Sequence, residues 1–296
     1  MLRKSNPLRV ALLAVGVICA FSSYATIVSD TVYLNRGTML AVDSTNIPYF
    51  AFNNTSVFDR ENERLFLDVD DTMELLVINT DSLTHGFDIK HYTGVNSVNS
   101  VIPANSSILV SFQFQEEGAY IFYDPTQSES FRYMGAGGMI VCRSPNANIH
   151  RFFWNMKDHQ VLFNENLNQG IPVDWTQYYP NYFTINGNSN PYINEDSDAR
   201  VTGSVGDTIY IYMVNTGQSL HSIHLHGYHG EIIQSSKFPS HVGRSKDTVP
   251  VYSMEVVILK IVPDQPGEYP VHDHNLVAVS GGNIYPNGMF LTMLIN

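Results

Sequence analysis

Two stretches decide the fold of this chain: Leu220-His221-Ser222-Ile223-His224-Leu225-His226-Gly227 and, about fifty residues later, Val271-His272-Asp273-His274. In the first stretch His224 and His226 alternate with Leu225, and in the second two histidines flank Asp273. Successive side chains of an extended strand point to opposite faces, so the two histidines of each pair share a face. Two such strands side by side would bring four imidazoles together.

This arrangement predicts a metal site formed by His224, His226, His272 and His274, because neutral imidazole is the commonest protein ligand for zinc and copper. The alternative is that the rings are solvated or bonded to backbone, as is usual for a single H-x-H pair. Five of the eleven histidines in the chain lie in these two short clusters, each within apolar, strand-like sequence. That concentration favours the metal site.

The N-terminus predicts export. Residues 1–25 contain the basic residues Arg3, Lys4 and Arg9, an apolar core at 10–21, and a small-x-small cleavage site that ends at Ala25. The apolar core is too short to span a bilayer, and no later stretch approaches eighteen apolar residues. We therefore expect a signal peptide at 1–25, a periplasmic or extracellular protein, and no membrane partner.

Cysteine content and charge narrow the function further. Of the two cysteines, Cys19 lies in the expected signal peptide, which leaves Cys142 as the one thiol and excludes an intramolecular disulfide. The formal charge is −12. An acidic surface argues against nucleic acid and anionic lipid as partners, and it attracts cationic partners and metal ions.

An internal repeat predicts two similar domains. Short apolar or alternating runs bounded by turn residues recur at 74–78, 107–114, 208–214 and 255–262, as in β-sandwiches. Matching residues lie 136 positions apart at first and about 150 apart later, as for a duplicated domain with a longer loop in its second copy. The pairs are Asp71-Thr72 with Asp207-Thr208, Asn79-Thr80 with Asn215-Thr216, His85 with His221, Gly118-x-Tyr120 with Gly267-x-Tyr269, and Gly138-Met139 with Gly288-Met289. We expect a first domain at 26–145, a connection at 146–170 and a second domain at 171–296.

The two copies differ at the histidines. Where the second copy has His224 and His226, the first has Asp88 and Lys90, and where the second has its later pair, the first has Tyr123 and Pro125. Protonated lysine has no lone pair to give, and proline has no side-chain donor atom. The first domain therefore cannot build the same four-histidine site.

The second half resembles the last cupredoxin domain of multicopper oxidases, strongly over residues 180–296 and, through the repeat, more weakly over 50–145. The segments that carry the resemblance are Tyr182-Phe183-Thr184-Ile185-Asn186-Gly187, the stretch 221–227, Gly267-x-Tyr269-x-x-His272-Asp273-His274 and Gly288-Met289. The resemblance implies two tandem cupredoxin-like Greek-key β-sandwiches and copper as the cofactor, with zinc as the runner-up.

The same resemblance assigns residues. The four predicted ligands fall on positions that bind half of a trinuclear copper cluster in this family. His221 and Met289 fall on type 1 copper positions, but Asp273 stands where the family has the cysteine thiolate on which blue-copper electron transfer depends. His221, Asp273 and Met289 therefore look like a vestige. In the first domain the corresponding position is Asp124, so that copy is expected to lack a type 1 site too.

Copper nitrite reductases offer a second comparison. They resemble this chain in an Asp-His pair at Asp273-His274 and in a first-domain motif similar to residues 85–90, whose aspartate, here Asp88, is catalytic. Two-domain relatives are typically trimers with a metal site between subunits, which implies a homotrimer. Asp88, as general acid or base, and the ligand His224 are thus the candidate catalytic residues. An ion pair between Asp88 and Lys90 is the structural alternative.

Three function classes remain open. The first is a multicopper oxidase-like oxidoreductase that takes electrons directly from a small-molecule or metal-ion substrate. The second is a non-enzymatic copper-binding or delivery protein. The third is a zinc-dependent hydrolase that uses the same histidines.

Overall fold

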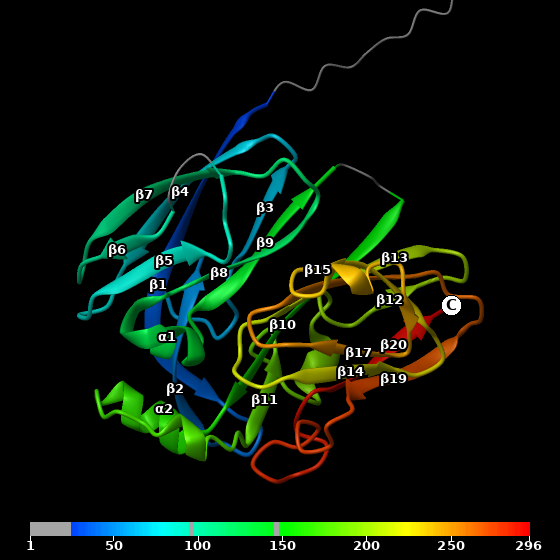
Figure 1. Ribbon diagram of the computed structural model, residues 1–296. Helices are drawn as coiled ribbons and strands as arrows, with labels where there is room; N and C mark the ends of the chain where they lie inside the picture. Colours follow the sequence, from blue (N-terminus) through cyan, green and yellow to red (C-terminus); the bar gives the residue numbers. More distant parts are fainter. Residues whose placement is uncertain (1–24, 95–97, 145–147) are drawn as a thin grey trace, which may run out of the picture.

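The computed structural model describes residues 25–94, 98–144 and 148–296 (Figure 1). Apart from Ala25, the predicted signal peptide lies outside the described residues. Strands dominate the described chain. Within the described ranges, no helix is long and apolar enough to cross a membrane.

The N-terminal half is a sandwich of two sheets. Its strands are β1 (Ile27–Leu40), β2 (Asn46–Asn53), β3 (Arg64–Asp68), β4 (Thr72–Asn79), β5 (His85–Ile89), β6 (Ser100–Ile102), β7 (Ser107–Gln113), β8 (Gly118–Tyr123) and β9 (Gly137–Arg143). The strand orders are β2-β1-β4-β7 and β3-β9-β8-β5-β6. Buried and partly exposed residues alternate along β4, which gives its sheet one buried face. Met73, Leu75 and Val77 are buried, and the residues between them are partly exposed. The segment α1 (Thr126–Tyr133) follows β8.

The C-terminal half is a second sandwich, with strand orders β11-β10-β13-β18-β15-β16 and β12-β20-β19-β14-β17. Its strands are β10 (Ile149–His159), β11 (Tyr182–Ile185), β12 (Thr202–Gly203), β13 (Thr208–Asn215), β14 (His221–Leu225), β15 (Gly230–Ser235), β16 (Ser245–Lys246), β17 (Thr248–Val251), β18 (Val256–Ile261), β19 (Gly267–Asp273) and β20 (Phe290–Ile295). The short helices are α2 (Val161–Asn168), η1 (Trp175–Gln177), η2 (Tyr192–Glu195) and η3 (Pro239–His241).

The two sandwiches repeat one topology. Parallel pairing of β1 with β4 recurs as β10 with β13, and parallel pairing of β3 with β9 recurs as β12 with β20. His85 lies opposite Ile102, and His221 lies opposite Val251. Between these pairs the second copy adds the hairpin β15–β16 to one sheet edge. The repeat seen in the sequence is therefore a repeat of structure, and the hairpin is the longer loop.

The segment expected as a connection, residues 146–170, contains regular structure. Its strand β10 lies inside the second sandwich, between β11 and β13. The end of β10 carries Lys157, Asp158 and His159, which are charged or polar and yet fully buried. Each of them has a polar partner, which is what allows such residues to end a buried strand.

The two sandwiches pack sheet against sheet. Apolar side chains of β8 and β9, among them Ile121 and Val141, form one cluster with Phe153, Tyr212 and Ile258 of the second sandwich. These three residues lie on β10, β13 and β18. The other sheet of the second sandwich is therefore separated from the first sandwich by a whole core. Figure 1 shows β14, β17, β19 and β20 together on that far side.

Candidate functional site

Strands β14 and β19 place the predicted histidines. They pair antiparallel with His224 directly opposite His272. Ile223, Leu225 and Val271 alternate with the histidines and enter the core of the second sandwich. Burial of these apolar residues fixes the register, since a slip of one residue would turn the histidines inward. The imidazoles consequently point outward from the far sheet.

The four predicted imidazoles come together. From the ring centre of His224 the distances are 4.6 Å to His226, 5.5 Å to His272 and 5.5 Å to His274. The Nε2 atoms of His226 and His272 are 3.1 Å apart. These side chains thus lie in one cluster, on the shared face that alternation along the two strands predicts.

Two of the rings are held in the tautomer that a metal needs. His224 Nδ1 is 2.9 Å from the Thr248 hydroxyl oxygen and 3.2 Å from the carbonyl oxygen of Asp247, and His272 Nδ1 is 2.9 Å from the carbonyl oxygen of Asp273. A carbonyl oxygen only accepts, so each Nδ1 donates its proton. The neutral ring then carries its lone pair on Nε2. Metal-binding histidines are oriented by this kind of contact.

His226 completes the contact with His272. Because two lone pairs cannot face each other at 3.1 Å, one of the two Nε2 atoms carries a proton in the metal-free protein. Burial, and then the neighbouring charges of His224 and His272, lower the pKa of His226. A lower pKa favours the neutral ring, which is the form that binds metal.

Imidazole nitrogens are suitable ligands for a copper ion, but the four rings are not already arranged around one point. Among the described residues, no group of three or more His, Cys, Asp or Glu side chains is already arranged to hold one ion. His226 and His274 are exposed, whereas His224 and His272 are partly buried. Coordination by three rings therefore needs side-chain movement. The site is a surface cluster of imidazoles on a rigid pair of strands.

The positions assigned to a vestigial type 1 site lie directly beneath this cluster. His221 and Asp273 are buried, and His221 Nδ1 is 2.7 Å from Asp273 Oδ2. On its other side, His221 Nε2 is 3.7 Å from Asp158 Oδ1, which is an ion-pair distance and too long for a hydrogen bond. Burial alone would lower the pKa of His221, but the carboxylates of Asp158 and Asp273 outweigh it and raise the pKa to about 9. Met289 is fully buried in the core.

The first sandwich has a similar buried arrangement. His85 Nδ1 is 2.6 Å from Asp124 Oδ2, and its Nε2 is 3.1 Å from Asp81 Oδ2. In both copies, therefore, a histidine at the repeat position lies between two carboxylates.

Asp88, the other candidate catalytic residue, has its contacts within the first sandwich. Its carboxylate lies 3.4 Å from the Tyr123 hydroxyl and 3.4 Å from Asn99 Nδ2. Lys90 lies over the Tyr123 ring, 5.8 Å from the ring centre, and among the described residues no ion pair within 4 Å joins it to Asp88. Burial raises the pKa of Asp88. The Asp88 contacts therefore do not join it to the histidine cluster of the same chain.

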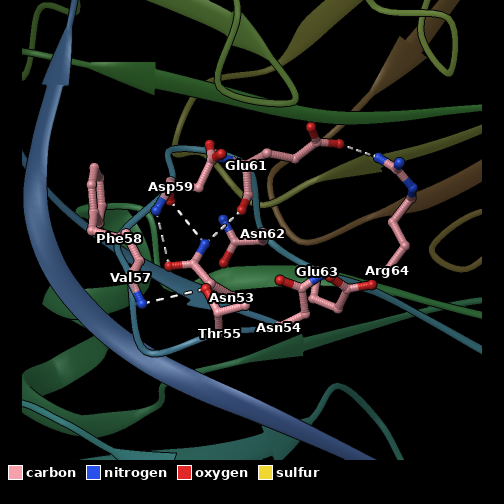
Figure 2. Close-up of a pocket in the computed structure, with 10 residues that line it drawn as sticks. All are labelled: Asn53, Asn54, Thr55, Val57, Phe58, Asp59, Glu61, Asn62, Glu63 and Arg64. Carbon is pink, nitrogen blue, oxygen red and sulfur yellow. Dashed lines mark hydrogen bonds and ion pairs between the residues drawn. The ribbon is translucent and has the colours of Figure 1, made fainter.

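A pocket of about 410 Å³ lies elsewhere, in the loop between β2 and β3 (Figure 2). Asn53 is at its centre. The Asn53 amide nitrogen donates to the carbonyl oxygens of Asp59 and Glu61, and the Asn53 side-chain oxygen accepts from Asp59 N. Glu61 forms an ion pair with Arg64. These polar groups therefore form hydrogen bonds and ion pairs with one another within the loop. None of the predicted site residues lines the pocket.

Sequence reasoning missed the residues that support the histidines. Thr248 and Asp158 come from segments far along the chain, so alternation within β14 and β19 gave no sign of them. One signal was available for Asp158. The run Lys157-Asp158-His159 comes two residues after the apolar residues 152–154, where a buried charge needs a partner.

Comparison with known proteins is consistent with this geometry. Residues 164–294 match the family model described as multicopper oxidase. A search of curated proteins found no significant match. Among solved structures, a blue copper oxidase from Nitrosomonas europaea is similar, with 19% identity, a TM-score of 0.75, and coverage of 91% of this chain and 86% of that one.

Two further structures show the same fold. The multicopper oxidase mgLAC is 18% identical with a TM-score of 0.76, and the match covers 92% of this chain and 87% of that one. A copper nitrite reductase from Nitrosomonas europaea is 15% identical with a TM-score of 0.70, covering 91% and 94%. The expected fold, two tandem cupredoxin-like Greek-key β-sandwiches, is confirmed.

Proposed function

We propose that the protein is an exported copper-binding oxidoreductase of the multicopper oxidase type. Two findings support the proposal: residues 164–294 match the multicopper oxidase family model, and the chain shares its fold with a blue copper oxidase and a copper nitrite reductase. Its copper site consists of His224, His226, His272 and His274. Bound copper would supply one-electron redox chemistry at the outer face of the second sandwich.

One observation carries this proposal: four imidazoles gather on two adjacent strands, and two of them are fixed with Nε2 as the lone-pair atom. Imidazole is a good ligand for both copper and zinc. The family match favours copper, and no comparison favours zinc.

The proposed centre works without a blue-copper relay. Asp273 bonds to His221 through a carboxylate, and Cys142 is buried with a pKa raised to about 12 by burial and nearby acidic groups. Cys142 is the one cysteine among the described residues, so that part of the chain offers no thiolate to carry electrons between substrate and copper. Electrons therefore come directly from a small-molecule or metal-ion substrate.

The other half of the site comes from a second copy in this proposal. The histidine sheet faces away from the first sandwich of its own chain, which leaves its outer face open to a neighbour. A homotrimer would bring Asp88 of a neighbouring subunit to the copper as a general acid or base. The raised pKa of Asp88 is consistent with that role.

The test is copper loading of the purified protein without its signal segment. We expect about one copper per chain, a type 2 electron paramagnetic resonance signal and no intense blue absorption. His272→Ala should abolish this signal. His229→Ala, which removes an exposed histidine outside the cluster, should retain it. Zinc in place of copper in protein taken from its natural compartment, or an unchanged signal in His272→Ala, would contradict the proposal.

A non-enzymatic copper carrier is the second candidate, and the exposure of His226 and His274 favours it. Exposed ligands allow an ion to exchange with a partner protein. Oxygen uptake during turnover of a reducing substrate separates the two candidates: sustained uptake identifies the oxidoreductase, and a copper signal without uptake identifies the carrier.

A further inference from the structure

The buried contact between His221 and Asp273 joins the two strands that carry the histidine cluster. His221 begins β14, and Asp273 ends β19. Both side chains are fully buried on the inner face of the sheet, and the bond between them is 2.7 Å long. It is therefore a cross-strand tie beneath the cluster.

The backbone ladder between these strands is short. It pairs Ile223 with Asp273, His224 with His272 and Leu225 with Val271. The Asp273 carboxylate adds two contacts between these strands, from the His221 ring and from the backbone N–H of Ser222, and it also accepts a local hydrogen bond from the backbone N–H of Asn275. Hydrogen bonds to an ionised carboxylate are shorter and roughly twice as strong as those between neutral groups, so these contacts reinforce the short ladder.

The contact between His221 and Asp273 holds the backbone next to two of the cluster histidines. Asp273 lies between His272 and His274 in the sequence, and its side chain points inward while theirs point outward. Fixing the Asp273 carboxylate consequently fixes the backbone on which both rings are mounted. The Asp273 carbonyl oxygen in addition accepts from His272 Nδ1.

His221 is itself held from behind. Asp158 lies 3.7 Å from its Nε2, and the Asp158 carboxylate accepts from Ser219 Oγ at 2.6 Å and from Gln218 N at 2.7 Å. Tyr178 donates to the same carboxylate at 2.6 Å. The buried His221 ring thus lies between two carboxylates, hydrogen-bonded to Asp273 and within ion-pair distance of the anchored Asp158.

We propose that His221 is a positioning residue of the metal site: by bridging Asp158 and Asp273 inside the sandwich, it sets the mutual placement of His224, His272 and His274 on the outside. This inference rests on the proposed copper site. It assigns a role to a buried residue that does not touch the metal.

The first sandwich provides a matched control. His85 is equally buried and lies between Asp124 and Asp81, with its Nδ1 2.6 Å from the first carboxylate, close to the 2.7 Å of the second copy, and its Nε2 3.1 Å from the other, closer than the 3.7 Å of the second copy. The outer face of that copy carries Asp88 and Lys90 where the second copy has its histidines. His221→Gln and His85→Gln therefore remove equivalent buried rings, but only one of them lies beneath the cluster.

The experiment compares these two variants with the parent protein by thermal unfolding and by titration with Cu²⁺, well below the unfolding temperature. Co²⁺ serves as a second probe, because its visible spectrum reports coordination geometry. Both variants should unfold at lower temperature. Only His221→Gln should bind copper more weakly, by about tenfold to a hundredfold, as for other outer-shell partners, and its Co²⁺ spectrum should change.

Three results overturn the inference. A folded His221→Gln protein that binds copper like the parent would refute it, and so would an equal loss of affinity in His85→Gln. If His221→Gln does not fold, Asp273→Asn tests the same tie with less change of volume, and parent-like affinity in that variant would be equally decisive. A parent protein that binds no copper removes the proposed function itself, so the two failures are distinguishable.

Discussion

His221 and His159 are both fully buried, yet their surroundings shift their pKa values in opposite directions. Burial lowers the pKa of His159 to about 4 and outweighs the neighbouring Asp158 carboxylate, which acts in the opposite direction. At His221 the two carboxylates outweigh burial and raise the pKa to about 9. The first ring is therefore neutral and the second is an imidazolium over most of the physiological range.

The imidazolium should make stability depend on pH. Because the pKa of His221 is higher in the folded state than the unfolded value of about 6.5, its contribution is fully present below pH 6.5 and is lost as pH rises through 9. We expect a loss on the order of 3 kcal/mol in the free energy of unfolding for metal-free protein. Urea unfolding from pH 6 to 10 measures it, and His221→Gln should lack this alkaline slope. An identical slope in both proteins would contradict the assignment.

The Thr248 hydroxyl should tune copper affinity through His224. Thr248→Val removes the 2.9 Å partner of His224 Nδ1 and leaves the 3.2 Å contact to the Asp247 carbonyl oxygen. We expect about tenfold weaker copper binding, the lower end of the usual range for such partners. Thr248→Ser should restore the affinity of the parent. Competition titration with a copper chelator gives the measurement, and equal affinities in the valine and serine variants would exclude this role.

Among the elements, β14 and β19 were predictable and β10 was not. Strict alternation of histidine with leucine, isoleucine and valine decided which faces β14 and β19 present, and a repeat offset located their counterparts in the first half. The charged residues Lys157 and Asp158 argued against a buried strand at β10, because charged side chains are usually exposed. Their burial depends on partners such as the Gly137 carbonyl oxygen, which no local pattern shows.

The loop between β13 and β14 should not tolerate a larger residue at Gly217. A Cβ atom there would lie 2.0 Å from Asp158 Oδ1, next to the His221 contact. We expect Gly217→Ala to reduce the free energy of unfolding by about 1–3 kcal/mol through overpacking. Gly230→Ala is the control, because its Cβ would meet only side-chain atoms, of Leu259 at 3.3 Å and Ile261 at 3.6 Å, close to ordinary van der Waals contact. Chemical denaturation compares them, and equal stabilities would rule out the crowding.

At the scale of the whole molecule, Arg132 couples the two sandwiches. It is buried, donates to the carbonyl oxygens of Thr216 and Gly217 at 2.7 and 2.9 Å, and reaches Gln218 Oε1 at 2.6 Å. The same loop donates its own N–H groups to Asp158. One buried guanidinium from the first half thus completes the polar network of the second.

Removal of Arg132 should therefore uncouple the halves. Arg132→Met leaves buried carbonyl oxygens without a donor, and we expect a loss of about 2–4 kcal/mol in stability and a split of the unfolding transition. Arg64→Met removes another inter-sandwich ion pair, to the more exposed Asp198, and should cost about 1 kcal/mol or less. Differential scanning calorimetry distinguishes them. A single, unshifted transition in Arg132→Met would refute the coupling.

The strand order of the histidine sheet also has a consequence for biosynthesis. β19 lies between β14 and β20, and β20 is supplied by residues 290–295, which are made after all four ligands. A nascent chain that has emerged only as far as residue 289 exposes every imidazole but lacks the neighbour that holds β19 in place. We therefore expect metal loading at this face to follow the emergence of β20 and its pairing with β19.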